Sequence, residues 1–83
     1  MPSDAGAALR DMERHIDLAV QFVARMDYEA FRDDARTLYA VTRCLEIISE
    51  ASRRLPAQLV WDTVQLALPP LRDVITREIA ALE

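Results

Sequence analysis

The chain has 83 residues, of which 52% are hydrophobic and 29% charged, with a formal net charge of −4. A chain of this length forms one domain with a small core, because folding buries only about 60–65% of its surface. One glycine and four prolines exclude a fibrous chain and favour long helices, and the acidic balance argues against a broad electropositive surface for nucleic acid.

The N-terminal segment predicts an amphipathic helix with Ser3 or Asp4 as its cap. Its apolar residues recur at spacings of three and four, which places them on one helical face: Leu9, Met12, Ile16, Ala19, Val23 and Met26. The segment has no basic region followed by an apolar run, and no stretch approaches the roughly 20 apolar residues of a membrane span. We therefore expect a soluble, cytoplasmic protein without an export signal.

The stretch "MDYEAFRDDA" is turn-like and predicts a short helical corner after the first helix. Tyr28 and Phe31 are expected to fold back onto the core there. Asp33 or Asp34 is expected to cap the next helix, because a short acidic side chain can accept the unpaired N–H groups of a first turn.

A second helix is predicted over residues 35–55, with two adjacent apolar rows. One row holds Leu38, Val41, Leu45, Ile48, Ser52 and Leu55, and the other holds Ala40, Cys44, Ile47 and Ala51. So wide an apolar arc has to be covered on more than one side, by the chain itself and by a neighbouring helix or a second protomer. Cys44, Ile47 and Ala51, together with Trp61 further along, are therefore candidate interface residues.

Pro56 is expected to end this helix, because proline lacks the N–H that a helix interior requires and restricts the residue before it. A last helical region follows from residue 60, interrupted by Pro69 and Pro70. The interruption predicts either a kink or a break, with both prolines in the first turn of a separate helix. The expected fold is all-α, an antiparallel up-and-down bundle of three to four helices that forms a symmetric dimer.

Cys44 is the single cysteine, so no internal disulfide can form, and no cluster of histidine and cysteine has metal-ligand spacing. We expect no metal and no other cofactor, and a reduced compartment. Mid-helix on an apolar row, Cys44 is most simply a small buried hydrophobic residue.

Three pieces of the sequence, taken in order, resemble the HepT-like proteins, a branch of the HEPN helical domains. They are the "DYEAF" corner, the helix that contains "LEIISEASRRLP", and the later "VWDTVQLALPPLR". The resemblance implies an all-helical, dimeric and metal-independent ribonuclease, acting on RNA as the toxin of a prokaryotic toxin–antitoxin pair. It also implies a nucleotidyltransferase-type (MntA-like) antitoxin as partner.

The family's catalytic signature is an arginine followed, after four to six residues, by a histidine, on a helix between "RLP" and "VW". In this chain the interval is only Ala57, Gln58 and Leu59. Metal-free RNA cleavage requires a base for the ribose 2′-hydroxyl and a cation for the crowded phosphorane, which such a pair supplies. Residues 1–83 are therefore interpreted as a single HepT-like domain that lacks the catalytic helix between Pro56 and Val60.

The segment "RDMERH" also fits the signature, with Arg10 and His15 at the required spacing. We reject it as the active site, because it precedes the segments that carry the resemblance and because one match is expected by chance among ten arginines. The simpler interpretation places Arg10, Arg14 and His15 on the surface, paired with Asp11 or Asp17.

Four charged residues of the second helix are further candidates: Glu46, Glu50, Arg53 and Arg54. By resemblance this helix borders the catalytic cleft, so its polar side chains could support that cleft or contact RNA phosphates. The alternative is structural, with Glu50 paired to Arg53 and Arg54 and both cations favoured by the helix dipole. Trp61 is more often a core or interface anchor than a platform for stacking bases.

Three functions remain open on the sequence. The first is a toxin-type ribonuclease, inactive if its catalytic segment is missing. The second is a non-catalytic module for dimerisation or antitoxin binding, since a bundle short of one helix leaves apolar surface for a partner. The third is a small helical protein without toxin ancestry.

Overall fold

The computed structural model describes residues 4–82, and in that part of the chain it contains five helices and no strand. They are α1 (Asp4–Val23), α2 (Tyr28–Arg32), α3 (Ala35–Ser52), α4 (Ala57–Leu66) and α5 (Leu68–Leu82). The all-helical prediction is confirmed, and α2 is the expected corner. Of the two predicted caps of the first helix, Ser3 lies outside the described residues, and α1 begins at Asp4.

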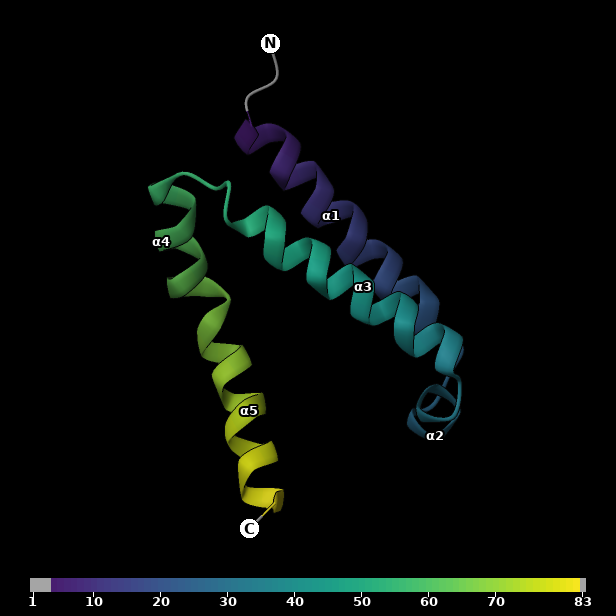
Figure 1. Ribbon diagram of the computed structural model, residues 1–83. Coiled ribbons are helices and arrows are strands. Elements are labelled where there is room, and N and C mark those ends of the chain that lie inside the picture. Colours follow the sequence, from purple (N-terminus) through teal and green to yellow (C-terminus); the bar gives the residue numbers. More distant parts are fainter. Residues whose placement is uncertain (1–3, 83) are drawn as a thin grey trace.

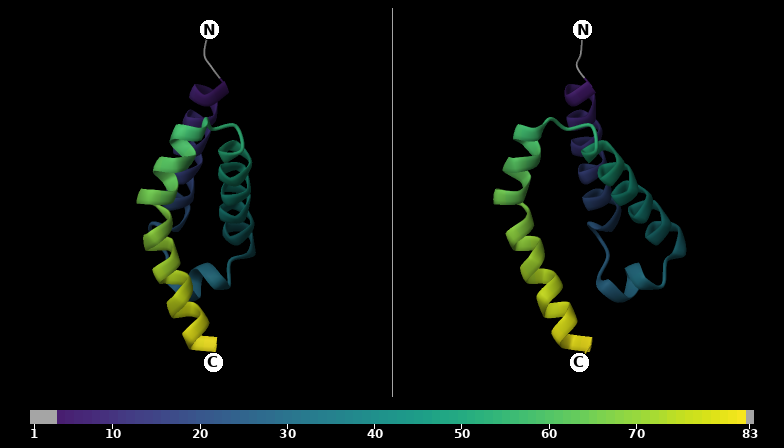
Figure 2. Two further views of the ribbon diagram at one scale, coloured as in Figure 1. Left: turned by 90° about the vertical axis from the view of Figure 1, so that its left-hand side faces the viewer. Right: turned by 60° about the vertical axis from the view of Figure 1, so that its left-hand side comes forward.

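Helices α1 and α3 form an antiparallel hairpin, side by side in both views (Figures 1 and 2). The three buried hydrophobic residues along this hairpin are small: Ala8 on α1, and Cys44 and Ala51 on α3. Small side chains let two helix backbones approach closely, and the packing there is sensitive to added volume. The core of the described structure is therefore a narrow seam between two helices.

The two short connections around α2 are fixed by aspartate caps. The Asp27 carboxylate accepts from the N–H of Ala30 over 2.8 Å, which begins α2. The Asp34 carboxylate accepts from the N–H of Thr37 over 3.1 Å and from its hydroxyl over 2.9 Å, which begins α3. Of the two predicted caps of α3 the structure selects Asp34, because Asp33 is the residue that ends α2.

The expectation that Tyr28 folds onto the core is wrong. Its side chain is 72% exposed, and the guanidinium of Arg32 lies 6.0 Å from the centre of its ring. Phe31, three residues on, is half-buried as expected.

Helix α3 ends at Ser52, three residues before the predicted limit, and a turn over residues 53–55 leads to Pro56. Pro56 has extended backbone angles (φ −69°, ψ 161°), and its carbonyl accepts from the N–H groups of Leu59 and Val60. Ala57 is thus the first residue of α4. Residues 57–59 form the first turn of that helix.

Helices α4 and α5 make an arm that leaves the hairpin near its open end and diverges from it (Figures 1 and 2). The arm breaks at Ala67, and Pro69 and Pro70 lie in the first turn of α5, where a missing N–H costs little. This confirms the second of the two predicted arrangements. The radius of gyration is 15.0 Å, compared with about 12 Å for a compact chain of this length, because the arm does not close the bundle.

Candidate functional site

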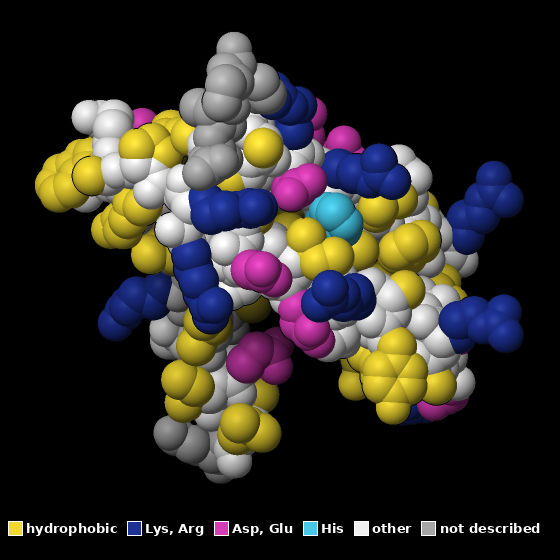
Figure 3. All heavy atoms as spheres, turned by 45° about the horizontal axis from the view of Figure 1, so that its top comes forward, with side chains coloured by type: hydrophobic (Ala, Val, Ile, Leu, Met, Phe, Trp, Pro, Cys, Tyr) yellow, Lys and Arg dark blue, Asp and Glu magenta, His cyan; other side chains and the backbone are white. Residues whose placement is uncertain are grey.

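A polar cluster lies where the C-terminal end of α3 meets α1. The guanidinium of Arg54 donates to the carboxylate of Asp11 over 3.3 Å, and the backbone carbonyl of Asp11 lies 2.7 Å from Nδ1 of His15. On this face of the molecule the histidine lies among basic and acidic side chains (Figure 3). Asp11 therefore brings an arginine and the histidine of the described chain into one neighbourhood.

The cluster corrects the predicted pairing within α1. Asp11 pairs with Arg54, in the turn after α3, instead of with Arg10 or Arg14 of its own helix. Nδ1 of His15 donates to the Asp11 carbonyl, while the Asp11 carboxylate accepts from Arg54.

The outer face of α3 carries three of the four predicted charged candidates. Glu46, Glu50 and Arg53 line one shallow, partly polar depression with Thr42, Arg43, Leu45 and Ser49. Arg43 donates to the Glu46 carboxylate over 3.3 Å, in an exposed pair one helical turn apart. Exposed pairs of this kind contribute only about 0–1 kcal/mol to stability. The arrangement of these side chains therefore follows from the α3 helix and not from their charges.

The structural alternative for these residues is also corrected. Arg54 pairs with Asp11 and not with Glu50, so it faces α1, away from the depression that contains Glu50 and Arg53. Arg54 lies beyond the last residue of α3, in the turn that redirects the chain. The sequence did not reveal this pair, because it joins residues 43 positions apart.

The predicted interface residues separate into two groups. Cys44 and Ala51 are 4% and 1% exposed, because α1 covers them, so they are not accessible to a second protomer. Ile47 is half-buried, and Trp61 on α4 is 63% exposed. Of the four candidates, only Ile47 and Trp61 offer surface for a partner, and Trp61 is not a core residue within this chain.

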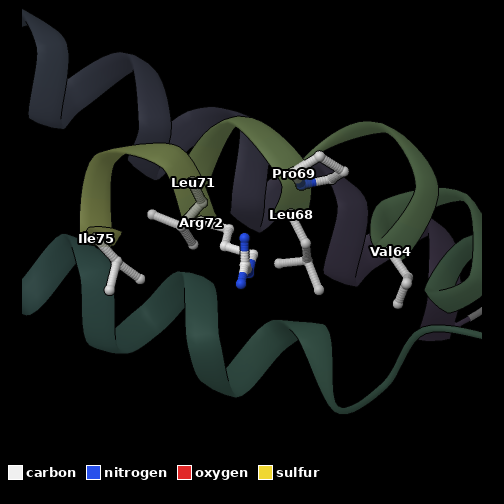
Figure 4. A pocket seen from close by; sticks show the side chains of 6 residues that line it. All are labelled: Val64, Leu68, Pro69, Leu71, Arg72 and Ile75. Atoms are coloured by element: carbon white, nitrogen blue, oxygen red, sulfur yellow. The ribbon is translucent and has the colours of Figure 1, made fainter. Parts of the chain in front are cut away.

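Sequence reasoning missed an apolar groove on the arm. It has a volume of about 430 Å³ and is lined by Val64, Leu68, Pro69, Leu71, Arg72 and Ile75. Val64, Leu68 and Ile75 point from the arm toward α3 (Figure 4). The signal was present as apolar spacing across the proline pair, but spacing alone does not show that the arm stands away from the hairpin.

Within residues 4–82, no group of three or more histidine, cysteine, aspartate or glutamate side chains is placed to hold a metal ion. None of the helices in that range has the length and apolar character needed to cross a bilayer.

The fold defines a small all-helical domain, built on an antiparallel hairpin with a capped corner and an open C-terminal arm. The family model described as "Ribonuclease HepT-like" matches residues 12–60, more than half of the chain. These residues include most of α1, all of α2 and α3, and the first turn of α4.

Curated relatives agree with this match. The proteins "Putative RNase MJ0125" and "Putative RNase MJ1216" of Methanocaldococcus jannaschii are 39% and 38% identical over 56 residues, 68% of this chain and 48% and 46% of theirs. "Probable ribonuclease HepT" of Thermococcus cleftensis is 42% identical over 48 residues, 58% of this chain and 44% of its own. No solved structure matches the chain significantly.

The chain belongs to the HepT-like ribonuclease family. It spans about half the length of the curated relatives it matches. The family match ends at Val60, so Trp61 and the rest of the arm lie outside the matched residues. The likeness of "VWDTVQLALPPLR" to the closing segment of the family therefore stays a prediction.

Proposed function

We propose that this protein is a HepT-like toxin component of a prokaryotic toxin–antitoxin system, and that the chain described here does not itself cleave RNA. Family membership supports the first half of the proposal. One observation carries the second half: Pro56 leads directly into α4, with its carbonyl bonded to the N–H groups of Leu59 and Val60. The interval expected to contain the Arg/His helix is a single helical turn of Ala57, Gln58 and Leu59.

The chemistry of that turn supports inactivity. Alanine and leucine have no titratable group, and a glutamine amide neither takes up a proton at neutral pH nor carries a positive charge. General-base catalysis and charge stabilisation of the transition state each contribute orders of magnitude to such a reaction. Without both groups, the family's metal-independent cleavage has no means of proceeding at this position.

The polar cluster of Arg54, Asp11 and His15 brings an arginine and the histidine of the described chain close to each other. Asp11 bonds to both, since its carboxylate accepts from Arg54 and its backbone carbonyl accepts from Nδ1 of His15. The cluster is better explained as a tie between α3 and α1. RNA is thus proposed as the substrate of the family and not of this chain.

An alternative function is a non-catalytic module for dimerisation or for binding the nucleotidyltransferase-type antitoxin, in the cytoplasm. The observation that favours it is the open arm, whose apolar groove on α4 and α5 is available to another chain. The depression on α3 with Glu46, Glu50 and Arg53 offers the antitoxin charged groups of both signs beside Leu45. Both functions are compatible with the same family; they differ in whether the protein acts as the toxin component or only as a binding module.

The deciding experiment is RNA cleavage by the purified protein in the presence of a chelator, with His15→Ala and Arg10→Ala as variants. We expect no cleavage above a blank. Cleavage that either variant abolishes would overturn the proposed inactivity and restore "RDMERH" as a site. An intact mass near 9.4 kDa would establish that the protein assayed has the short interval.

Binding of the antitoxin is tested by co-expression of this protein with the nucleotidyltransferase encoded beside its gene. Co-purification that Glu46→Arg with Glu50→Arg disrupts, while the matched change Glu13→Arg on α1 leaves it intact, would support binding at the α3 depression. A neighbouring gene of unrelated type would instead favour a helical protein without a toxin–antitoxin role.

A further inference from the structure

The arm turns an open apolar row toward α3. Val64, Leu68 and Ile75 point that way in Figure 4, and their side chains are 43–48% exposed. An isolated helix of about 12–15 residues is only marginally stable in water, and most helical stability in proteins comes from packing an apolar face. Helix α5 has 15 residues, so it is stabilised by a surface that covers this row.

The facing row of α3 is open as well. It begins at Ser52, which lines a pocket with Val64 and Leu68 where the arm joins the hairpin. Leu45 and Leu38 lie on the same side of α3, within about 40° of Ser52 around the helix axis. Their side chains are 58% and 41% exposed. The two rows therefore meet near Ser52 and separate toward the end of α5 (Figure 2).

The two rows are in register with each other. Ser52 and Val60 line the same pocket, which sets their common level. From there the row of α3 runs back in steps of four, three, four and three residues, and the row of the arm runs forward in steps of four, four, three and four. Because both helices rise about 1.5 Å per residue, the rows stay level to within one residue. Antiparallel contact then pairs Val64 with Ile48, Leu68 with Leu45, and Ile75 with Leu38.

The connection between the two rows is suited to movement. Residues 53–55 form a turn, and α4 begins at Pro56 without a hydrogen bond from a capping side chain. Arg54 in this turn is tied to α1 by an exposed ion pair, and such pairs contribute little to stability. In the arm, the side chain of Gln58 donates to Asp62 within α4 itself. The turn can therefore act as a hinge for the whole arm.

We propose that the arm is a lid with two positions. One is the open position of the structure, and in the other the arm lies antiparallel on α3 of the same chain, with Leu68 against Leu45 and Ile75 against Leu38. Leu45 also lines the charged depression on the outer face of α3. The closed lid covers this apolar edge, so the depression is complete only in the open position. The lid goes beyond the proposed function, because it is a property of the chain alone and is measured without RNA or an antitoxin.

The first test is a disulfide between the two rows. The variant Leu38→Cys with Ile75→Cys, in a Cys44→Ala background, is equilibrated in glutathione buffer, both natively and in urea. The ratio of oxidised to reduced protein gives the effective concentration of one thiol at the other. We expect this concentration to be about tenfold or more higher natively than in urea, because the closed lid holds the two positions opposite each other. The oxidised product should have the mass of one chain.

The variant Leu38→Cys with Asp73→Cys is the matched control, because residue 73 lies about 160° around α5 from Ile75. It should show no such gain. An effective concentration for the 38–75 pair no higher natively than in urea would overturn the lid, since the arm would then stay open. A disulfide-linked dimer as the main product would overturn it too, because a second copy and not the same chain would cover the arm.

The second test needs no disulfide and measures the protection of residue 45. Leu45→Cys in the Cys44→Ala background should react with a thiol reagent about twofold or more faster when Ile75→Asp is added. The reason is that a carboxylate buried against Leu38 disfavours the closed position. Ala80→Asp, about 140° around the helix from Ile75, is the matched control and should leave the rate unchanged. Equal rates in all three proteins would overturn the proposal.

Discussion

Arg54, just beyond the end of α3, donates a 3.3 Å hydrogen bond to the carboxylate of Asp11 on α1. The pair joins the two antiparallel helices at the open end of the hairpin, where the arm departs. Both side chains are about half exposed, at 47% and 50%, so water and salt weaken their attraction. Their interaction is thus expected to orient the turn more than to stabilise the fold.

Breaking the pair of Arg54 and Asp11 should lower the free energy of unfolding only slightly. Arg54→Ala and Asp11→Ala are each expected to lower the free energy of unfolding by about 0–1 kcal/mol, and by less in high salt. A double-mutant cycle in urea isolates the interaction from other effects of each change. A coupling energy of several kcal/mol, unaffected by salt, would contradict the assignment of an exposed pair.

The seam between α1 and α3 should be intolerant of added volume. Ala8 is fully buried, so Ala8→Leu is expected to lower the free energy of unfolding by about 1–3 kcal/mol through overpacking. The neighbouring Ala7 is exposed, so Ala7→Leu should change the free energy of unfolding little. Equal stabilities for the two variants in urea titrations would show that the helices do not pack through Ala8.

Much of the fold could be predicted from the sequence, because local rules decide it. Apolar spacing located α1 and α3, an aspartate cap placed the start of α3, and the proline pair placed the start of α5. The C-terminal limit of α3 and the exposure of Tyr28 were missed. Both depend on a turn whose shape is set by packing that spacing does not encode.

The candidate site was less predictable. The charged residues of α3 were located correctly on its surface, but the partner of Arg54 was not, since Asp11 is distant in sequence. Likewise, periodicity showed that α3 and α5 have apolar rows without showing which of them the chain covers. Cys44 and Ala51 were expected at an interface between protomers because nothing in their spacing distinguishes a partner helix from α1.

The thiol of Cys44 gives a direct measure of the seam. It is buried, and buried structural cysteines are inert because reagents cannot reach the thiolate. We expect slow reaction with a thiol reagent in the native protein and fast reaction in urea, with the native rate limited by opening of the hairpin. Ala8→Leu should accelerate the native reaction, whereas Ala7→Leu should not. Immediate labelling of the native wild-type protein would contradict the burial of Cys44 by α1.

The cap of α3 should make stability depend on pH. The N–H of Thr37 donates to the Asp34 carboxylate and, with the Thr37 hydroxyl, holds the pKa of Asp34 below its ordinary value of 3.8. A folded-state pKa below that of the unfolded chain means that the cap stabilises fully above the unfolded pKa. This contribution is lost as the pH falls through the folded pKa.

Asp34→Asn keeps a side-chain oxygen for the Thr37 N–H but cannot titrate, so it separates capping from charge. At pH 7 it should melt a few degrees below the wild type, and the difference should shrink as the pH is lowered through 4 toward 2. Asp34→Ala should have a lower melting temperature at pH 7 than the wild type and Asp34→Asn. Residue 33 does not cap α3, so Asp33→Asn should change the melting temperature less than Asp34→Ala does. Thermal unfolding followed by circular dichroism measures all four proteins. A constant difference between wild type and Asp34→Asn across this pH range would refute the proposed role of the Asp34 charge.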